Sequence, residues 1–266
     1  MFSCIFYVSF IFFFLWPIVS LDNLIIQIFL LFIRFFLSIF FSWLIVFLVF
    51  FICMFIVKRL RVNHPFKKIV IKSISKLIIR FFRIEIKVHN IHLFPKDNKL
   101  IIYSNHKSHL DSFIIASIVP SVIAFSPKDE LYKGFLGFFL SFCFEATGCM
   151  KIVRNNIKET IKNIIKSSEN VKKGLSMVIF HEGGIKNKKN DFIEESLDGA
   201  FRITTLSKAV IVPISLKGVS FIRGKCWFRK KKVELFIHSP IYFEQYKKES
   251  TKDINKKVTS IINSVL

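Results

Sequence analysis

Long uncharged apolar runs occupy the first part of the chain. Residues 1–57 hold only two charges, Asp22 and Arg34, among many phenylalanines, isoleucines and leucines. Residues 35–57 form an uncharged run long enough to cross a hydrocarbon core about 30 Å thick as one helix. A second uncharged run covers residues 2–21. The pattern therefore predicts that residues 1–57 are a hydrophobic membrane anchor of one or two helices.

Two arrangements of this anchor fit the sequence. One is a hairpin of two spanning helices, and the other is one spanning helix joined to a re-entrant or interfacial segment near Asp22 and Arg34. A cleaved signal peptide fits less well, because no basic region precedes the apolar run and no small-residue cleavage pattern follows it. Lysine and arginine are dense directly after residue 57. By the positive-inside rule we expect this end of the anchor, and the rest of the chain, on the cytoplasmic side of a membrane.

Residues 58–83 combine positive charge with a helical period. Between residues 66 and 82 a lysine or arginine recurs every four residues, and apolar residues occupy the other side. The pattern predicts an amphipathic helix with a cationic stripe, and such a helix at a membrane exit can lie on anionic lipid. A solvated face on a helix that packs against the following domain is the alternative. The residues of the stripe are Lys68, Lys72, Lys76 and Arg80.

From residue 84 onward, short apolar runs alternate with longer polar or amphipathic stretches, which is typical of an α/β domain. The domain would cover residues 84–266. Strands are predicted at residues 84–88, 100–103, 122–125, 150–153, 177–180, 210–214 and 233–237. Helices are predicted at residues 109–118, 129–142, 156–173, 197–207 and 251–265.

Composition narrows the kinds of partner. The formal net charge is +22, which would suit nucleic acid as well as anionic lipid. The chain has no zinc-ligand spacing and no aromatic RNA-binding motif, and its hydrophobic anchor favours a lipid bilayer over nucleic acid. The five cysteines are scattered and contain no C-x-x-C pair, so we expect reduced structural thiols. No metal site is predicted.

Polar residues follow the predicted strand at residues 100–103, in the run Asn105-His-Lys-Ser-His-Leu-Asp111. Strand ends are where α/β proteins collect chemistry. A histidine that acts as a general base needs a group that fixes its tautomer, and Asp111 can do this if a turn brings it onto the ring of His106. Such a spacing arises by chance roughly one time in five in a chain of this composition. The alternative is a polar turn at His106 with Asp111 capping the next helix.

Three further blocks follow in order: residues 128–154, Phe180-His-Glu-Gly-Gly184, and residues 211–214, which read Ile-Val-Pro-Ile. With these four blocks the chain resembles the lysophosphatidic acid acyltransferase family, the 1-acylglycerol-3-phosphate O-acyltransferases. The blocks of that family read approximately NHxSxxD, a helix that leads to a strand with Gly and Arg, FPEGTRS, and IVPV. The resemblance covers about residues 85–220 and keeps the order and approximate spacing of the blocks.

The resemblance implies a fold and a reaction. The fold would be α/β, with a mixed β-sheet flanked by helices, and residues 84–266 would be the catalytic domain. A fatty acyl group would pass directly from acyl-CoA or acyl carrier protein to the hydroxyl of 1-acyl-glycerol-3-phosphate, a lysophospholipid, to give phosphatidic acid. His106 would remove the hydroxyl proton and Asp111 would orient its ring. The family implies no cofactor and no metal beyond the thioester cosubstrate.

The resemblance also implies residues that bind the substrates. Arg154 matches an arginine that holds the acceptor phosphate, and a guanidinium suits this role through its fork of donors. A surface arginine is the alternative for Arg154, while a role in holding or capping the turn is the alternative for Asn105 and Ser108. A plain turn after a buried strand is the alternative for Glu182 and Gly183. The implied substrate-binding set is Asn105, Ser108, Arg154, Glu182 and Gly183.

The third block departs from the family pattern. His181, Gly184 and Ile185 stand where the family has Pro, Thr and Arg. Because an expected phosphate ligand is absent, an acyltransferase for another lysolipid, or for a lipid without phosphate, is an alternative. An inactive membrane-anchored protein that binds anionic lipid is an alternative of another class, against which the complete catalytic pair argues. Lysines that can replace the arginine are Lys186, Lys188 and Lys189.

Overall fold

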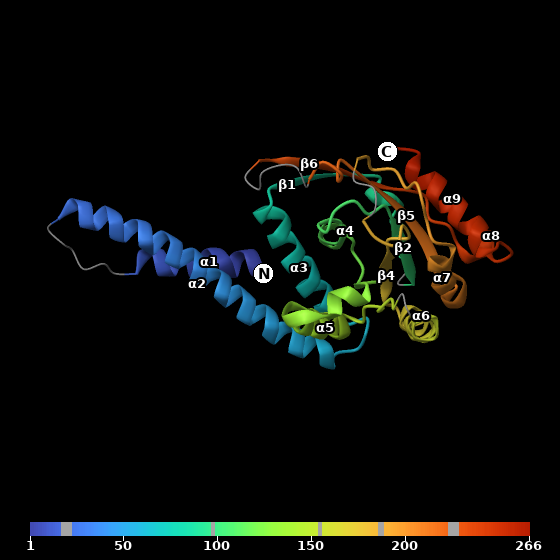
Figure 1. Ribbon diagram of the computed structural model, residues 1–266, viewed down its shortest axis with the longest axis horizontal. Coiled ribbons are helices and arrows are strands. Elements are labelled where there is room, and N and C mark those ends of the chain that lie inside the picture. The colour runs from blue at the N-terminus through green and yellow to red at the C-terminus, as the bar shows by residue number, and fades with distance from the viewer. Residues whose placement is uncertain (17–22, 97–98, 154–155, 186–188, 223–228) are drawn as a thin grey trace.

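The computed structural model describes residues 1–16, 23–96, 99–153, 156–185, 189–222 and 229–266. An α/β domain fills one side of the molecule, and two N-terminal helices project away from it (Figure 1). Six described strands form one sheet in the order β1-β6-β5-β2-β4-β3. The strands are β1 (Ile84–His89), β2 (Leu100–Ser104), β3 (Ile123–Phe125), β4 (Ser176–Ile179), β5 (Val210–Lys217) and β6 (Lys231–Ile237).

The sheet is mixed, because β5 and β6 pair antiparallel while the other neighbouring strands pair parallel. Helices cover both of its faces, so the predicted fold class is confirmed. The α-helices of the domain are α3 (Pro65–Phe81), α4 (Asp111–Ile118), α5 (Gly134–Thr147), α6 (Ile157–Lys172), α7 (Arg202–Ser207), α8 (Phe243–Tyr246) and α9 (Thr251–Asn263). Short 3₁₀ helices are η1 (Ile91–Leu93), η2 (Asp129–Tyr132) and η3 (Asp198–Phe201).

Strand β2 lies between β5 and β4 and is buried on both faces. Its residues alternate between two hydrophobic cores, as the period of two in a strand requires. Ile101 and Tyr103 face a core that includes side chains of α6, α7 and α9. Leu100 and Ile102 face a second core that includes side chains of α3 and α4. The strand is therefore held rigidly, and the residues that follow it start from a fixed point.

Two predicted elements differ from the structure. Residues 150–153 do not form a strand, because Ile152 makes only an isolated bridge to Lys128. Pro127 faces this segment and has no backbone N–H to donate, which limits the pairing to a few bonds. The predicted helix at residues 129–142 is instead η2 followed by α5. Gly134 separates them with a left-handed φ of 75°.

The N-terminal segment contains α1 (Phe2–Leu15) and α2 (Leu24–Arg59), which pack against each other. Helix α2 is continuous through Arg34, and its 36 residues are about 54 Å long at 1.5 Å per residue. It is the one helix among the described residues that is long and apolar enough to cross a membrane. The 14 residues of α1 are about 21 Å long, less than a hydrocarbon core. The described helices thus differ from a hairpin of two spanning helices.

Helix α3 connects this N-terminal pair to the domain. Val70 and Leu77 pack in a small core with side chains of α1 and α2, and Ile79 packs in the core beneath the sheet. The predicted cationic stripe is divided between two environments. The ammonium group of Lys72 donates to the carbonyl of Ile118, and burial lowers its pKa. Lys76 and Arg80 are exposed.

Candidate active site

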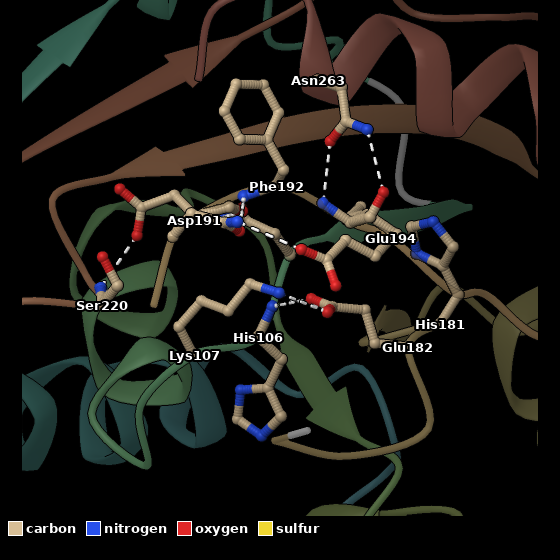
Figure 2. Close-up of polar contacts among 12 residues, drawn as sticks. His106, Lys107, His181, Glu182, Asp191, Phe192, Glu194, Ser220 and Asn263 are labelled. Atoms are coloured by element: carbon tan, nitrogen blue, oxygen red, sulfur yellow. Dashed lines mark hydrogen bonds and ion pairs between the residues drawn. The ribbon is translucent and has the colours of Figure 1, made fainter. Parts of the chain in front are cut away.

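Two of the sequence blocks meet at one edge of the sheet. Strands β2 and β4 are parallel neighbours, so the segments after their carboxyl ends lie side by side. Residues 105–111 follow β2, and residues 180–184 follow β4. Figure 2 shows His106 and Lys107 of the first segment close to Glu182 of the second segment. The candidate site therefore lies at the carboxyl end of the sheet, the position expected from the sequence.

His106 and Asp111 are in contact. Nδ1 of His106 lies 3.0 Å from Oδ2 of Asp111. The same Oδ2 accepts the backbone N–H groups of Lys107 at 2.7 Å and Ser108 at 2.8 Å. The carboxylate is fully buried at the start of α4, and it points back onto the ring instead of capping the helix. Because a carboxylate only accepts hydrogen bonds, Nδ1 carries the proton and Nε2 has a free lone pair.

The ring of His106 is fixed by its surroundings and still accessible. It stacks on Phe180 with the ring centroids 4.1 Å apart and an angle of 13° between the planes. The backbone N–H of His106 donates to Oε1 of Glu182 at 2.6 Å. About one sixth of the His106 side chain, 16%, remains exposed. A histidine in this setting can take a proton from a group that approaches Nε2.

A buried ion pair joins the two blocks. Nζ of Lys107 lies 2.5 Å from Oε2 of Glu182, and the side chains are 0% and 4% exposed. Burial raises the pKa of Glu182, and the hydrogen bonds from Lys107 and His106 oppose this change. Glu182 was expected to bind substrate, but both of its oxygens contact the first block. Lys107 was not singled out in the sequence, because a lysine in a lysine-rich chain is expected on the surface.

Asn105 and Ser108 have local partners. Asn105 is fully buried, and its amide bonds to the backbone of Asp191 and Leu216 through three hydrogen bonds of 2.8 to 2.9 Å. Asn105 therefore holds the turn in place, and its contact with substrate stays a prediction. Oγ of Ser108 accepts the backbone N–H of Leu110 at 3.2 Å, which fits a role in holding the turn before α4.

Asp191 is a second residue that the sequence did not indicate. Its Oδ2 accepts the backbone N–H of Gly218 at 2.6 Å, and its Oδ1 accepts that of Ser220 at 2.8 Å. Its own carbonyl accepts from Asn105. Asp191 thus connects the turn after β2 to the segment after β5, as the close-up in Figure 2 illustrates in part. No local motif marks it, since its partners are distant in the chain.

Gly183 occupies a place that favours glycine. Its φ is 69°, in the left-handed region, and a Cβ there would lie 2.5 Å from Cδ1 of Leu197. Its backbone N–H donates to the carbonyl of Phe180 at 3.2 Å, which closes the turn after β4. Gly183 therefore shapes the turn that positions Glu182.

His181, which stands where the family has proline, lies inside the domain. It is fully buried in edge contact with the rings of Tyr103 and Phe201, and Nε2 lies 3.1 Å from the hydroxyl of Thr259. Burial lowers its pKa to about 3. The ring is therefore neutral near pH 7 and supports the core beside the site.

The expected phosphate ligands are only partly described. Arg154, Lys186 and Lys188 lie outside the described residues, and Lys189 is exposed. Among the residues that the structure describes, no group of three His, Cys, Asp or Glu side chains is arranged to hold a metal ion. The described residues thus supply a candidate catalytic pair, His106 and Asp111, and its supports.

Two comparisons find similar proteins. The sequence profile of the Acyltransferase family matches residues 85–217, which is half of the chain. No curated protein matches it significantly. Among solved structures, the crystal structure of the 1-acyl-sn-glycerophosphate (LPA) acyltransferase, PlsC, from Thermotoga maritima is similar, with a TM-score of 0.61 and 23% sequence identity. The match covers 80% of this chain and 84% of that one, so the two proteins share a fold.

Proposed function

Because the chain belongs to the Acyltransferase family, we propose that it is a membrane-bound lysophosphatidic acid acyltransferase. It would transfer a fatty acyl group from acyl-CoA or acyl carrier protein to 1-acyl-glycerol-3-phosphate, forming phosphatidic acid in phospholipid synthesis. The observation that carries the proposal is the contact of 3.0 Å between Nδ1 of His106 and Oδ2 of Asp111. The similarity in fold to PlsC, which is described as an LPA acyltransferase, supports the choice of acceptor.

In the proposed reaction His106 is the general base. Asp111 keeps the proton on Nδ1, so Nε2 takes the proton of the acceptor hydroxyl as its oxygen attacks the thioester carbon. A carbon–oxygen bond forms and the carbon–sulfur bond breaks. The proton passes from His106 to the departing thiolate, which leaves as a thiol. Asp111 stabilises the imidazolium during the step, and no acyl-enzyme is needed.

Lys107 and Glu182 act as positioning residues in this reaction. Glu182 accepts the backbone N–H of His106, and Lys107 neutralises the same carboxylate inside the domain. Together with the stacking on Phe180, these contacts limit the movement of the imidazole. Such fixed geometry matters, because a displacement of about 1 Å can cost about a hundredfold in rate.

The membrane part of the proposal rests on α2. Its surface carries many exposed phenylalanine, leucine and isoleucine side chains, which an aqueous environment would not favour. Both the acceptor and the product of the reaction reside in a bilayer, so an anchored domain would stay near its substrate. By the positive-inside rule, Lys58 and Arg59 at the end of α2 favour a cytoplasmic position of the domain.

A different acceptor is the second candidate. Gly184 and Ile185 replace the threonine and arginine of the family pattern, so the site has one expected phosphate ligand fewer. An acceptor with another headgroup, or a lipid without phosphate, would need that ligand less. The reaction and the catalytic pair would be the same in both cases.

An acyltransferase assay tests both candidates. Membranes that contain the protein would be given acyl-CoA or acyl carrier protein, and lysophosphatidic acid, lysophosphatidylcholine or monoacylglycerol as acceptor. We expect turnover of lysophosphatidic acid by the wild type and none above background by His106→Ala. Turnover of another acceptor alone would replace the first candidate by the second. A folded wild-type protein that acylates none of these lipids would contradict the enzymatic proposal.

A further inference from the structure

Helix α5 exposes an apolar surface although it belongs to the α/β domain. Phe135, Leu136 and Phe138 are 94%, 71% and 83% exposed. These three residues define the α5 surface. Residues 134–144 of the helix contain no charge, and Lys133 and Glu145 flank this run. Three large apolar side chains exposed so completely and so close together indicate a surface that contacts a partner.

Helix α5 also packs on the apolar helix α2, through residues one and two turns after Phe135 on the same helix face. Phe139 contacts the rings of Phe47 and Phe51, with centroids 5.2 and 5.8 Å apart, and Phe142 contacts the ring of Phe55 at 4.8 Å. At the end of both helices the ammonium group of Lys58 lies 2.7 Å from the carboxylate of Glu145. Residue numbers rise together in these contacts, so the two helices run in the same direction over this stretch.

This register places the α5 surface at the level of an apolar part of α2. The partners of α5 lie between residues 47 and 55, within the uncharged run of α2, and the charged ends of both helices meet at one level. Exposed side chains of α2 at this level include Phe47, Leu48 and Phe55. The α5 surface and the exposed side of α2 are therefore continuous, and whatever covers one is adjacent to the other.

We propose that the α5 surface inserts into the acyl boundary of a lipid bilayer, as a membrane contact of the α/β domain in addition to α2. This inference rests on the proposed membrane attachment of α2. Lys133, which precedes the surface, has a side chain that is 73% exposed, and its ammonium group lies 3.6 Å from the carboxylate of Asp129. An uncharged aromatic face beside a cation is the composition of an interfacial helix.

Photo-cross-linking in membranes tests the proposal. Benzoylphenylalanine would replace Phe135 or Phe138 in the full chain, in membranes that contain radiolabelled phospholipid. Leu48 on α2, which is 51% exposed, is the positive control, and Tyr242, which is 47% exposed, is the aromatic control. Tyr242 immediately precedes α8, which lies on the far side of the domain from α2 (Figure 1).

We expect lipid labelling at Phe135 and Phe138 as strong as at Leu48, and about tenfold above that at Tyr242, because an inserted face meets acyl chains continuously. Labelling at Leu48 with only the Tyr242 level at Phe135 and Phe138 would overturn the α5 contact and leave the anchor in place. Labelling at none of the positions would overturn both. A cross-linked product of two protein chains in place of lipid labelling would show that a second copy covers the surface.

Discussion

The ammonium group of Lys107 and the carboxylate of Glu182 form an ion pair of 2.5 Å inside the domain, 75 residues apart in the chain. Their side chains are 0% and 4% exposed. Two charges removed from water are tolerated only together, because either one alone would be buried without a counter-ion. The pair therefore ties the segment after β2 to the segment after β4, and the position of His106 depends on both.

Lys107→Met should destabilise the protein by about 3–5 kcal/mol, because it leaves the Glu182 carboxylate buried without its cation. The double variant Lys107→Met/Glu182→Gln should recover most of this loss, since the glutamine oxygen can still accept the N–H of His106 and no charge remains. Urea unfolding of the variants in detergent micelles measures the difference. Equal unfolding midpoints for wild type and Lys107→Met would show that the pair is not buried in solution.

Asp111→Asn should lower kcat by about 10³- to 10⁴-fold with little change in KM, as expected when the group that orients a catalytic histidine is replaced by its amide. The asparagine oxygen can still accept the N–H groups of Lys107 and Ser108, so the turn should persist. The same oxygen would still face Nδ1 of His106, but it would lack the carboxylate charge that stabilises the imidazolium when the ring takes a proton. Steady-state kinetics with a matched Ser108→Ala control measures the effect.

Ser108→Ala removes a hydroxyl that holds the turn before α4 and keeps the backbone bond to Asp111. We therefore expect at most about a threefold change in kcat, corresponding to less than about 1 kcal/mol. A decrease for Asp111→Asn as small as that for Ser108→Ala would remove Asp111 from the mechanism.

Local patterns were sufficient to predict much of the fold and the contact between His106 and Asp111. The apolar runs that form β2 and β4 are bounded by polar residues. A short, continuous apolar run of this kind is typical of a strand that is buried on both faces. His106 and Asp111 are joined within one turn, so their spacing alone carries the geometry. The absence of charge indicated the part of α2 at residues 35–57, but it did not indicate that the helix starts at Leu24 and continues through Arg34.

The supports of the site could not be predicted, because they depend on contacts between distant segments. Lys107 is buried only because Glu182 is brought to it from another strand. Asn105 holds the turn through bonds to Leu216, which is 111 residues away in the chain. The strand expected at residues 150–153 was prevented by Pro127, which belongs to the opposite segment. Arg154 lies outside the described residues and stays a prediction.

Gly183→Ala should destabilise the protein by about 2 kcal/mol or more, since a left-handed backbone costs an alanine about 1–2 kcal/mol and its Cβ would also meet Leu197. Gly199→Ala is the matched control, because it has no atom within 4 Å of an added Cβ. We expect the control to change stability by less than about 1 kcal/mol. Urea unfolding measures both, and an equal effect of the two substitutions would contradict the role of Gly183.

Phe135→Ser/Phe138→Ser should weaken the contact of the domain with membranes while leaving its fold unchanged, because both side chains are almost entirely exposed. If the proposed reaction holds, we expect KM for a long-chain acceptor in vesicles to rise about three- to tenfold and KM for a short-chain soluble acceptor to stay constant. Tyr242→Ser is the control. A parallel rise of both KM values would point to damage at the active site instead.

His181 should make stability depend on pH. The ordinary pKa of a histidine is 6.5, and burial lowers that of His181 to about 3 in the folded protein. As the pH falls below 6.5, the unfolded chain binds a proton that the folded chain does not, so the free energy of unfolding decreases by about 1.4 kcal/mol per pH unit. The contribution of neutral His181 to the free energy of unfolding is complete above pH 6.5, and it is lost progressively as the pH falls toward 3.

His181→Phe should remove this part of the pH dependence, since a phenyl ring fits between Tyr103 and Phe201 and does not titrate. Unfolding in urea at pH 7 and pH 5 would be compared for the wild type, His181→Phe and the exposed control His92→Asn. We expect His181 to contribute about 2 kcal/mol to the loss for the wild type and the control between these pH values, and the loss for His181→Phe to be smaller by about this amount. Part of the loss should persist in that variant, because burial also lowers the pKa of His238. An unchanged pH dependence in His181→Phe would mean that His181 is protonated, or accessible to water, in the folded protein.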